Sequence, residues 1–118
     1  MSRHVINFSP QFAPLVESGA KRQTIRKLRK RPIRVGDTLR LYVGMRTKAC
    51  RLLGEAVCGS VECVVFGHGR GSHPTARQDQ EAFARTDGFE SYAEMLAWFE
   101  RTHGLPFEGV VIRWGYLR

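Results

Sequence analysis

Residues 18–34 read SGAKRQTIRKLRKRPIR, and eight of these seventeen residues are lysine or arginine. Residues 23–26 are predicted to form a short strand, on which Thr24 and Arg26 share one face because strand side chains alternate. The basic residues 27–34 include a proline and are predicted to form a mobile loop. The stretch therefore predicts a short strand and a basic loop in succession near the start of the fold.

The residues before this stretch are predicted to form a strand and a helix. VINF at 5–8 is a short apolar run, typical of a strand. In SPQFAPLVESG at 9–19, Ser9 is the expected N-cap and Gly19 the expected C-cap of a helix. Three apolar residues of this segment recur at helical spacing and are expected to face a core: Phe12, Leu15 and Val16.

The residues after the stretch are predicted to form further strands before the chain turns helical. In residues 39–43 apolar side chains alternate with Arg40 and Tyr42, which is typical of a half-buried strand. Residues 45–67 are predicted to form one long bent strand or two strands, with bends or bulges at Gly54 and Gly59. Residues 67–76 are predicted to form a glycine-rich loop, whose glycines do not follow a nucleotide-binding fingerprint.

The last third of the chain is predicted to hold two helices, at 77–86 and 91–103, and a final strand at 107–118. Ser91 and Glu94 have the spacing of a helix capping box. The second helix carries an apolar stripe of the kind that faces a core: Tyr92, Met95, Leu96 and Phe99, with Trp98 beside it. The final strand is expected to turn one apolar face inward: Val110, Ile112, Trp114 and Tyr116.

Several short strands around few helices indicate an α+β domain with a small, bent or closed sheet. The 118 residues are expected to form one domain, 1–118. No apolar run approaches the ~20 residues of a membrane span, and MSRHVINFSP lacks the apolar region of a signal peptide. Three cysteines, an odd number, fit a reducing compartment. We therefore expect a cytoplasmic protein without a membrane partner; a monomer is expected, although the sequence does not fix the oligomeric state.

The formal net charge of +8 favours a partner that carries phosphates or other negative charge. Residues 21–51 hold twelve of the nineteen lysines and arginines and one acid, Asp37, whereas residues 79–108 hold seven of the eleven acids. Two solvated faces are the plainest interpretation, but so large an excess of one sign repels itself unless an anion binds. The charge distribution therefore favours RNA or a related anion as partner.

Four side chains of zinc-ligand type recur every five residues: Cys58, Cys63, His68 and His73. Zinc sites usually take cysteine pairs that are two to four residues apart on a tight turn. A separation of five on a strand instead sends Cys58 and Cys63 to opposite faces. No local motif marks a cysteine nucleophile with a histidine base either. We therefore expect no metal and no cofactor.

The basic stretch also offers a lysine that is suited to be uncharged near neutral pH. Lys21 lies among Arg22, Arg26 and Lys27, and neighbouring positive charge or partial burial lowers the pKa of an ammonium group. A neutral lysine can act as a base or a nucleophile. The stretch supplies no carboxylate for proton transfer, so the partner must come from the acidic half. Two acids there are the candidates: Asp87 and Glu90.

Two motifs of the chain resemble the ASCH domain, a relative of the PUA RNA-binding domain. They are Lys-x-x-Thr-x-Arg at 21–26, which follows a predicted helix ending in glycine, and Gly-Asp-x-Leu-Arg at 36–40. The similarity runs through most of the chain, although in the second half it rests on the order of elements. It implies a small PUA-like β-barrel with flanking α-helices, a cleft lined by the Lys-x-x-Thr strand, and RNA or a modified nucleoside as ligand.

A bacterial branch of that family hydrolyses N4-acetylcytidine to cytidine and acetate with a lysine, a threonine and a glutamate. The resemblance carries the first two roles to Lys21 and Thr24. The nearest match to the glutamate is Asp87, which is one methylene shorter, and Glu90 is the alternative acid. Arg26 would then anchor the substrate.

Three functions are compatible with these residues, which favour binding of RNA or a nucleoside over catalysis. The first is an amidohydrolase that acts on an acylated pyrimidine nucleoside. The second is an RNA-binding module, or a ribonuclease that uses the same basic cleft. The third is a protein-interaction domain for an acidic partner, which nothing in the sequence favours over RNA. The residues expected to bind substrate or RNA are Arg22, Arg26, Lys27, Arg40, Tyr42, Arg46 and Lys48.

Overall fold

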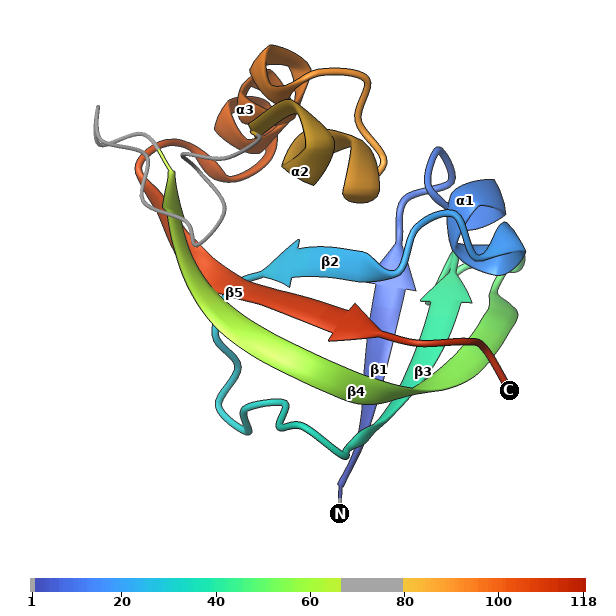
Figure 1. Ribbon diagram of the computed structural model, residues 1–118. Helices are drawn as coiled ribbons and strands as arrows, with labels where there is room; N and C mark the ends of the chain where they lie inside the picture. The colour runs from blue at the N-terminus through green and yellow to red at the C-terminus, as the bar shows by residue number, and fades with distance from the viewer. Residues whose placement is uncertain (1, 67–79) are drawn as a thin grey trace.

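The computed structural model describes residues 2–66 and 80–118 (Figure 1). Strands and helices follow the predicted order, and the class is α+β. The elements are β1 (Arg3–Phe8), α1 (Ala13–Ser18), β2 (Gln23–Arg26), β3 (Thr38–Val43), β4 (Arg51–Phe66), α2 (Gln80–Thr86), α3 (Tyr92–His103) and β5 (Phe107–Trp114).

The five strands of the described residues form one mixed sheet in the order β1-β3-β4-β5-β2. β1 runs parallel to β3, while the other neighbours are antiparallel. β4 is a single long, curved strand, whose first part pairs with β3 and whose second part pairs with β5 (Figure 1). The pairing register shifts beside Gly54 and at Gly59, because β4 has an extra residue at each of these places. Such extra residues bend a strand. The predicted irregularities at these two glycines are confirmed.

β1 and β2 stand at the two ends of the strand order, so the strand pairings of the described residues do not show the closed barrel that the resemblance implies. The free edge of β1 is bonded by arginine side chains instead. The Nη2 atoms of Arg26, Arg29 and Arg31 donate to the main-chain oxygens of Asn7, Val5 and Arg3, at 2.8, 2.9 and 2.7 Å. Ile33 is buried. Segment 27–34 is therefore held along β1 by hydrogen bonds, whereas the sequence predicted a mobile loop.

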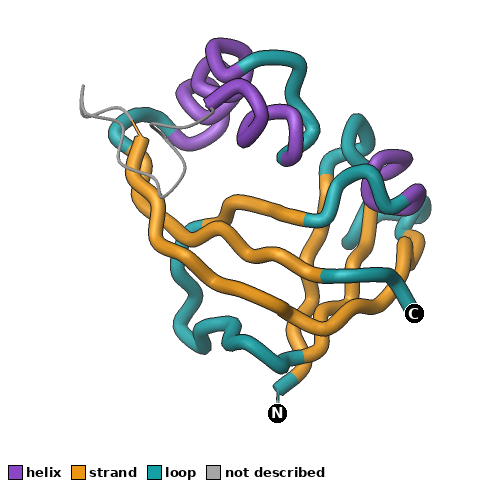
Figure 2. The backbone as a smooth tube through the Cα atoms, viewed as in Figure 1, coloured by secondary structure: helices purple, strands orange, loops and turns teal. Residues whose placement is uncertain are grey.

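An apolar core lies between the sheet and the helices. The alternation predicted for β3 is confirmed, with three buried side chains: Leu39, Leu41 and Val43. Phe66 of β4 and Phe107 of β5 contact Phe99 of α3, with ring centroids 5.3 and 4.9 Å away from that of Phe99. Figure 2 shows α2 and α3 together on one side of the strands, with α1 apart from them. These aromatic contacts fix α3 over the end of the sheet where β4 and β5 meet.

The helix α3 begins and packs as predicted. The Ser91 hydroxyl oxygen accepts a hydrogen bond from the main-chain N–H of Glu94 at 3.0 Å, which satisfies one of the free donors of the first turn. Met95 and Phe99 are buried, and Trp98 is half-buried against them. The apolar stripe is therefore part of the core.

Only part of the preceding region can be compared with its prediction. The helix predicted at 77–86 is present as α2 from Gln80 onward. Residues 67–79, which include the glycine-rich loop, His68 and His73, lie outside the described residues. Among the helices that are described, none is long and apolar enough to cross a membrane.

The predicted start of the first helix is wrong. α1 begins at Ala13, because residues 9–12 form a turn in which the N–H of Phe12 donates to the main-chain oxygen of Ser9 at 2.9 Å. Phe12 occupies the N-cap position, and no side chain caps the helix there. Ser9 is therefore a turn residue and not the N-cap.

The inward face predicted for the last strand is too long by one residue. β5 ends at Trp114, which pairs with Cys58 of β4 and is the last paired residue of the strand. Tyr116 lies beyond that end, is 81% exposed, and places its ring 4.3 Å from the guanidinium carbon of Arg22. Its aromatic ring thus covers a surface arginine, not the core.

Candidate active site

Lys21 reaches the interior because the chain reverses sharply after α1. Gly19 ends the helix in the left-handed conformation, with φ of 86°, and the N–H of Lys21 bonds the main-chain oxygen of Leu15 at 2.9 Å. The Lys21 side chain is 2% exposed. Its Nζ lies 4.8 Å from the ring centroid of Phe12 and 6.0 Å from that of Phe8. The ammonium position is therefore bordered by two aromatic rings instead of water.

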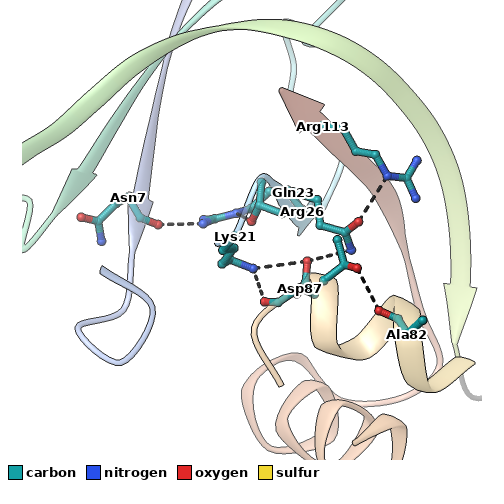
Figure 3. A network of polar contacts seen from close by, with 9 residues as sticks. Asn7, Lys21, Gln23, Arg26, Ala82, Asp87 and Arg113 are labelled. Carbon is teal, nitrogen blue, oxygen red and sulfur yellow. Dashed lines mark hydrogen bonds and ion pairs between the residues drawn. The ribbon is translucent and has the colours of Figure 1, made fainter. Parts of the chain in front are cut away.

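Asp87 lies at the end of α2 and meets Lys21 in the interior. Its N–H bonds the main-chain oxygens of Phe83 and Ala84, and Gly88 then turns the chain away with φ of 99°. Lys21 Nζ is 3.3 Å from Asp87 Oδ1 and also donates to the main-chain oxygen of Asp87 (Figure 3). Two residues that are 66 positions apart thus form a buried pair.

Burial moves both members of this pair toward their neutral forms. The pKa of Lys21 is lowered by burial, which outweighs the opposing effect of the Asp87 carboxylate. The pKa of Asp87 is raised by burial, against the opposing effects of Lys21, Gln23 and Arg26. Both shifts favour the neutral forms of the two groups over their charged forms.

Thr24 and Arg26 extend from β2 beside this pair and share one face, as predicted. Arg26 Nε donates to Thr24 Oγ1 at 2.9 Å. Because the threonine oxygen accepts that bond, its own O–H is free to donate to a ligand. Burial and the nearby Arg29 lower the pKa of Arg26 to about 10, so it still carries a positive charge at neutral pH. β2 therefore offers a hydroxyl donor and a cation next to the pair.

A pocket of about 190 Å³ brings these side chains together. Its polar lining includes four residues that the sequence singled out: Lys21, Thr24, Arg26 and Asp87. Its ring-bearing wall is formed by Phe8, Phe12, Phe89, Trp98, Phe99 and His103. Pockets for drug-sized ligands usually measure about 300–1,000 Å³. This one is suited to a single small planar group.

The other predicted binding residues are not gathered at the pocket, with one exception. Lys27 is exposed and lines its edge. Arg22 bonds the main-chain oxygen of Gly19, and Arg40 bonds Glu55 at 3.2 Å. Arg40 also lies near the hydroxyl of the predicted stacking residue Tyr42, at 3.3 Å. Arg46 and Lys48 are exposed in the turn after β3.

The structure separates the two candidate acids. Asp87 is 4% exposed and lines the pocket, whereas Glu90 is exposed and does not line it. The shorter aspartate reaches Lys21 from the turn that follows α2, in which Gly88 has a positive φ. Asp87 is therefore the acid whose position fits the predicted role.

Sequence reasoning missed Gln23, which is buried and donates from Nε2 to Asp87 Oδ1 at 3.2 Å. Strand alternation placed its side chain opposite to that of Thr24, yet β2 is buried on both faces. It also missed His103, which lines the pocket from the end of α3; burial, Lys27 and Arg26 lower the pKa of its imidazole. In the sequence, an uncharged amide among basic residues is the signal that could have pointed to Gln23.

The predicted absence of a metal centre concerns residues that are only partly described. Cys58 is buried and Cys63 is exposed. The irregularity at Gly59 pairs these cysteines with Trp114 and Val110, which lie four residues apart on β5, so their expected placement on opposite faces of β4 is wrong. His68 and His73 lie outside the described residues. Within residues 2–66 and 80–118, no group of three His, Cys, Asp or Glu side chains is close enough to hold a metal ion.

Comparison with known proteins identifies solved structures with a similar fold. No protein-family model and no curated protein sequence matches the chain. Two crystal structures of ZmASCH from Zymomonas mobilis are similar to it, one with a serine replaced by alanine and one with a tyrosine replaced by phenylalanine. Their TM-scores are 0.60 and 0.59 at 15% and 14% identity, over 99% and 100% of this chain and 70% and 72% of theirs. The chain therefore has the fold of an ASCH domain.

Proposed function

We propose that the pocket is the active site of an amidohydrolase that acts on an acylated aminopyrimidine nucleoside, such as N4-acetylcytidine. The observation that carries this proposal is the buried Lys21–Asp87 pair, with Nζ and Oδ1 3.3 Å apart at a pocket wall. Buried ionisable groups with shifted pKa values in a pocket are more typical of active sites than of structural ion pairs. The ASCH-domain fold is compatible with this role but does not establish it.

In the reaction that we propose, the pair begins with one shared proton, held by Asp87, and with Lys21 neutral. Water attacks the acyl carbon and gives a proton to Lys21 Nζ, while the carbonyl oxygen becomes an oxyanion that accepts hydrogen bonds from Thr24 and Arg26. Asp87 then protonates the exocyclic nitrogen as the C–N bond breaks, releasing a carboxylic acid and the free aminopyrimidine. Transfer of the proton from Lys21 back to Asp87 restores the starting state.

The shape of the pocket supports a flat base as the group that enters it. Aromatic rings from three parts of the chain surround it, with Phe12 lying 5.3 Å from Phe89 and 5.9 Å from Trp98 between ring centroids. A volume of about 190 Å³ leaves little space beyond one base and its acyl group. Rings of this kind can stack on the faces of a base.

Turnover of N4-acetylcytidine by the purified protein tests the proposal, with chromatographic detection of cytidine. We expect Lys21→Met and Asp87→Asn to lower kcat by at least about 100-fold, in the range of lost acid–base catalysis. Thr24→Val should lower kcat by about 100-fold through loss of an oxyanion donor, and Thr24→Ser should recover most of it. Glu90→Gln is the matched control, since this acid is exposed and should leave turnover unchanged.

Single-stranded RNA is the second candidate ligand, supported by the exposed Lys27 at the edge of the pocket. A base presented within an RNA strand would place a phosphate near this edge. Retention of a short RNA by the wild type and its loss in Lys27→Met would support this function. Chain cleavage of that RNA, removed by Lys21→Met, would indicate a ribonuclease instead of an amidohydrolase.

A further inference from the structure

A row of polar side chains runs from the protein surface to the buried carboxylate. Arg113 Nε donates to Gln23 Oε1 at 3.2 Å, and Gln23 Nε2 donates to Asp87 Oδ1 at 3.2 Å (Figure 3). Arg113 also bonds Glu62 through Nη1. Gln23 is 1% exposed, whereas the side chains of Arg113 and Glu62 are 29% and 37% exposed. β2, β5 and β4 each contribute to this row, which ends at the acid of the proposed active site.

The chemistry of each group fixes the direction of the row. A guanidinium group offers only donors, so Arg113 must meet the oxygen of the Gln23 amide. The amide nitrogen then faces Asp87 and can only donate to it. Arg113 lies opposite Gln23 in the register between β5 and β2, so the sheet itself sets this contact. Glu62 holds the guanidinium from its other side.

Both side-chain contacts of the Asp87 carboxylate are made by the same oxygen. Lys21 Nζ and Gln23 Nε2 approach Oδ1, at 3.3 and 3.2 Å. A carboxylate that is held at one oxygen from two directions keeps a fixed orientation. Oδ2 takes part in neither of these two contacts, and Asp87 lines the pocket.

We propose that Gln23 is a positioning residue that holds Asp87 so that Oδ2 serves the reacting amide, with Arg113 and Glu62 fixing the orientation of Gln23. This role rests on the proposed function for its catalytic consequence. The placement of Asp87 itself can be measured without any substrate, so the two claims can fail separately.

The first experiment follows the Asp87 carboxyl carbon by ¹³C NMR as the pH changes. Burial raises the pKa of Asp87 and the Gln23 hydrogen bond lowers it, so Gln23→Met should move the titration midpoint to higher pH. Arg113→Met should move it in the same direction by a smaller amount, and this half-exposed site remains testable if Gln23→Met does not fold. Arg51→Met, which removes a surface pair with Glu17, is the control and should leave the midpoint unchanged. An unchanged midpoint in Gln23→Met and Arg113→Met overturns the proposal.

The second experiment measures hydrolysis of N4-acetylcytidine across the pH range. Gln23→Met should lower kcat about 10- to 100-fold with KM nearly unchanged, because the acid is misplaced while the base still binds. The basic limb of the rate profile, where the proton held by Asp87 is lost, should move to higher pH, because the Gln23 hydrogen bond lowers the pKa of Asp87. An unchanged kcat together with an unchanged pH–rate profile in Gln23→Met would show that Gln23 has no catalytic role. If the wild type shows no turnover, the proposed function fails and the NMR titration alone decides the placement of Asp87.

Discussion

The buried contact between Lys21 and Asp87 contributes little net stability to a small protein. Removing two charges from water costs several kcal/mol per ion, and apolar replacements of similar volume are often as stable. The side chains of both residues are at most 5% exposed. A pair of this kind at a pocket is better explained by chemistry than by stability.

The pair predicts opposite pH dependences for its two single-residue variants. In Asp87→Asn, Lys21 is buried alone with a folded-state pKa below the ordinary 10.5, so stability should rise as the pH rises toward 10.5. In Lys21→Met, Asp87 is buried alone with a folded-state pKa above 3.8, so stability should fall as the pH rises from 3.8 through that raised value. Loss of either partner should cost up to about 3–5 kcal/mol where the remaining group is charged.

Urea unfolding of both variants between about pH 5 and pH 9 measures this dependence. Glu90→Gln is the control, because an exposed acid should leave the pH dependence as it is in the wild type. Parallel pH dependences in the two variants would contradict the burial of Lys21 and Asp87 as the cause of their pKa shifts.

At the scale of elements, the arginines of segment 26–31 protect the open edge of β1. Edge strands with free N–H and C=O groups are sites of unwanted pairing, and proteins usually cover or charge them. Here Arg26, Arg29 and Arg31 bond every second carbonyl along the strand, in step with its two-residue repeat. Three arginines of the basic stretch that suggested phosphate contacts therefore bond main-chain oxygens of β1 instead.

A double variant, Arg29→Met with Arg31→Met, separates the structural role from phosphate binding. We expect it to lower the free energy of unfolding by about 0.5–1.5 kcal/mol for each lost hydrogen bond, toward the lower end because both bonds are exposed. Lys30→Met is the matched control, an exposed cation between them with no partner in the described part of the chain. Unchanged stability together with an equal loss of RNA retention in both proteins would favour phosphate contact over edge protection.

The turn after α2 is a second element whose geometry supports the site. Gly88 has φ of 99°, and a Cβ placed on it would lie 3.0 Å from Cδ1 of Phe12. Gly88→Ala should therefore cost about 1–2 kcal/mol for the backbone conformation and more for the displaced ring. Gly19→Ala is the control, since this residue has a similar φ of 86° but only ordinary contact with Arg22 at 3.7 Å.

Urea unfolding of both glycine variants measures the difference, and turnover measures its effect on Asp87. Gly88→Ala should lose more stability than Gly19→Ala and should also lower kcat. Equal losses of stability would mean that Phe12 yields freely and that the turn does not fix the acid.

The elements could be predicted largely because their signals are local. The alternation of Leu39, Leu41 and Val43 and the cap at Ser91 follow from neighbouring residues alone, and both are confirmed. The start of α1 was misplaced because a turn at Ser9 and a cap at Ser9 have the same sequence signature. Edge protection by arginines was not predictable, since it depends on where β1 lies relative to a later segment.

At the scale of the whole molecule, many arginines of the basic half of the chain bond acceptors within the protein. Six of the eight arginines in residues 21–51 donate to acceptors within the protein: Arg22, Arg26, Arg29, Arg31, Arg40 and Arg51. A guanidinium group that bonds a main-chain oxygen keeps its charge, but the fold fixes its position.

The salt dependence of RNA binding tests this use of charge. For a single strand, the slope of log K against log salt concentration is about −0.7 for each phosphate contacted. We expect a slope of about −2, from roughly three contacts near Lys27, and weak affinity. A slope of about −7, as roughly ten phosphate contacts would give, would indicate that the basic stretch binds RNA. Filter retention of a short unstructured RNA at several salt concentrations gives this slope.

The candidate site was only partly visible in the sequence for a related reason. Lys21 and Thr24 are close in sequence, and the need for an acid from the other half pointed to Asp87 or Glu90. The choice between the two acids depends on Gly88 and on the placement of α2, which are tertiary features. Gln23 was missed because alternation cannot show that both faces of a short strand are buried.

Turnover of N4-acetylcytidine by the wild type and by Asp87→Asn tests the central claim most directly. The wild type should release cytidine and acetate in equal amounts, and the variant should be slower by at least about 100-fold while it remains folded. No release of cytidine by a folded wild-type protein, or equal rates for the two proteins, would contradict the assignment of the Lys21–Asp87 pocket as a hydrolytic site.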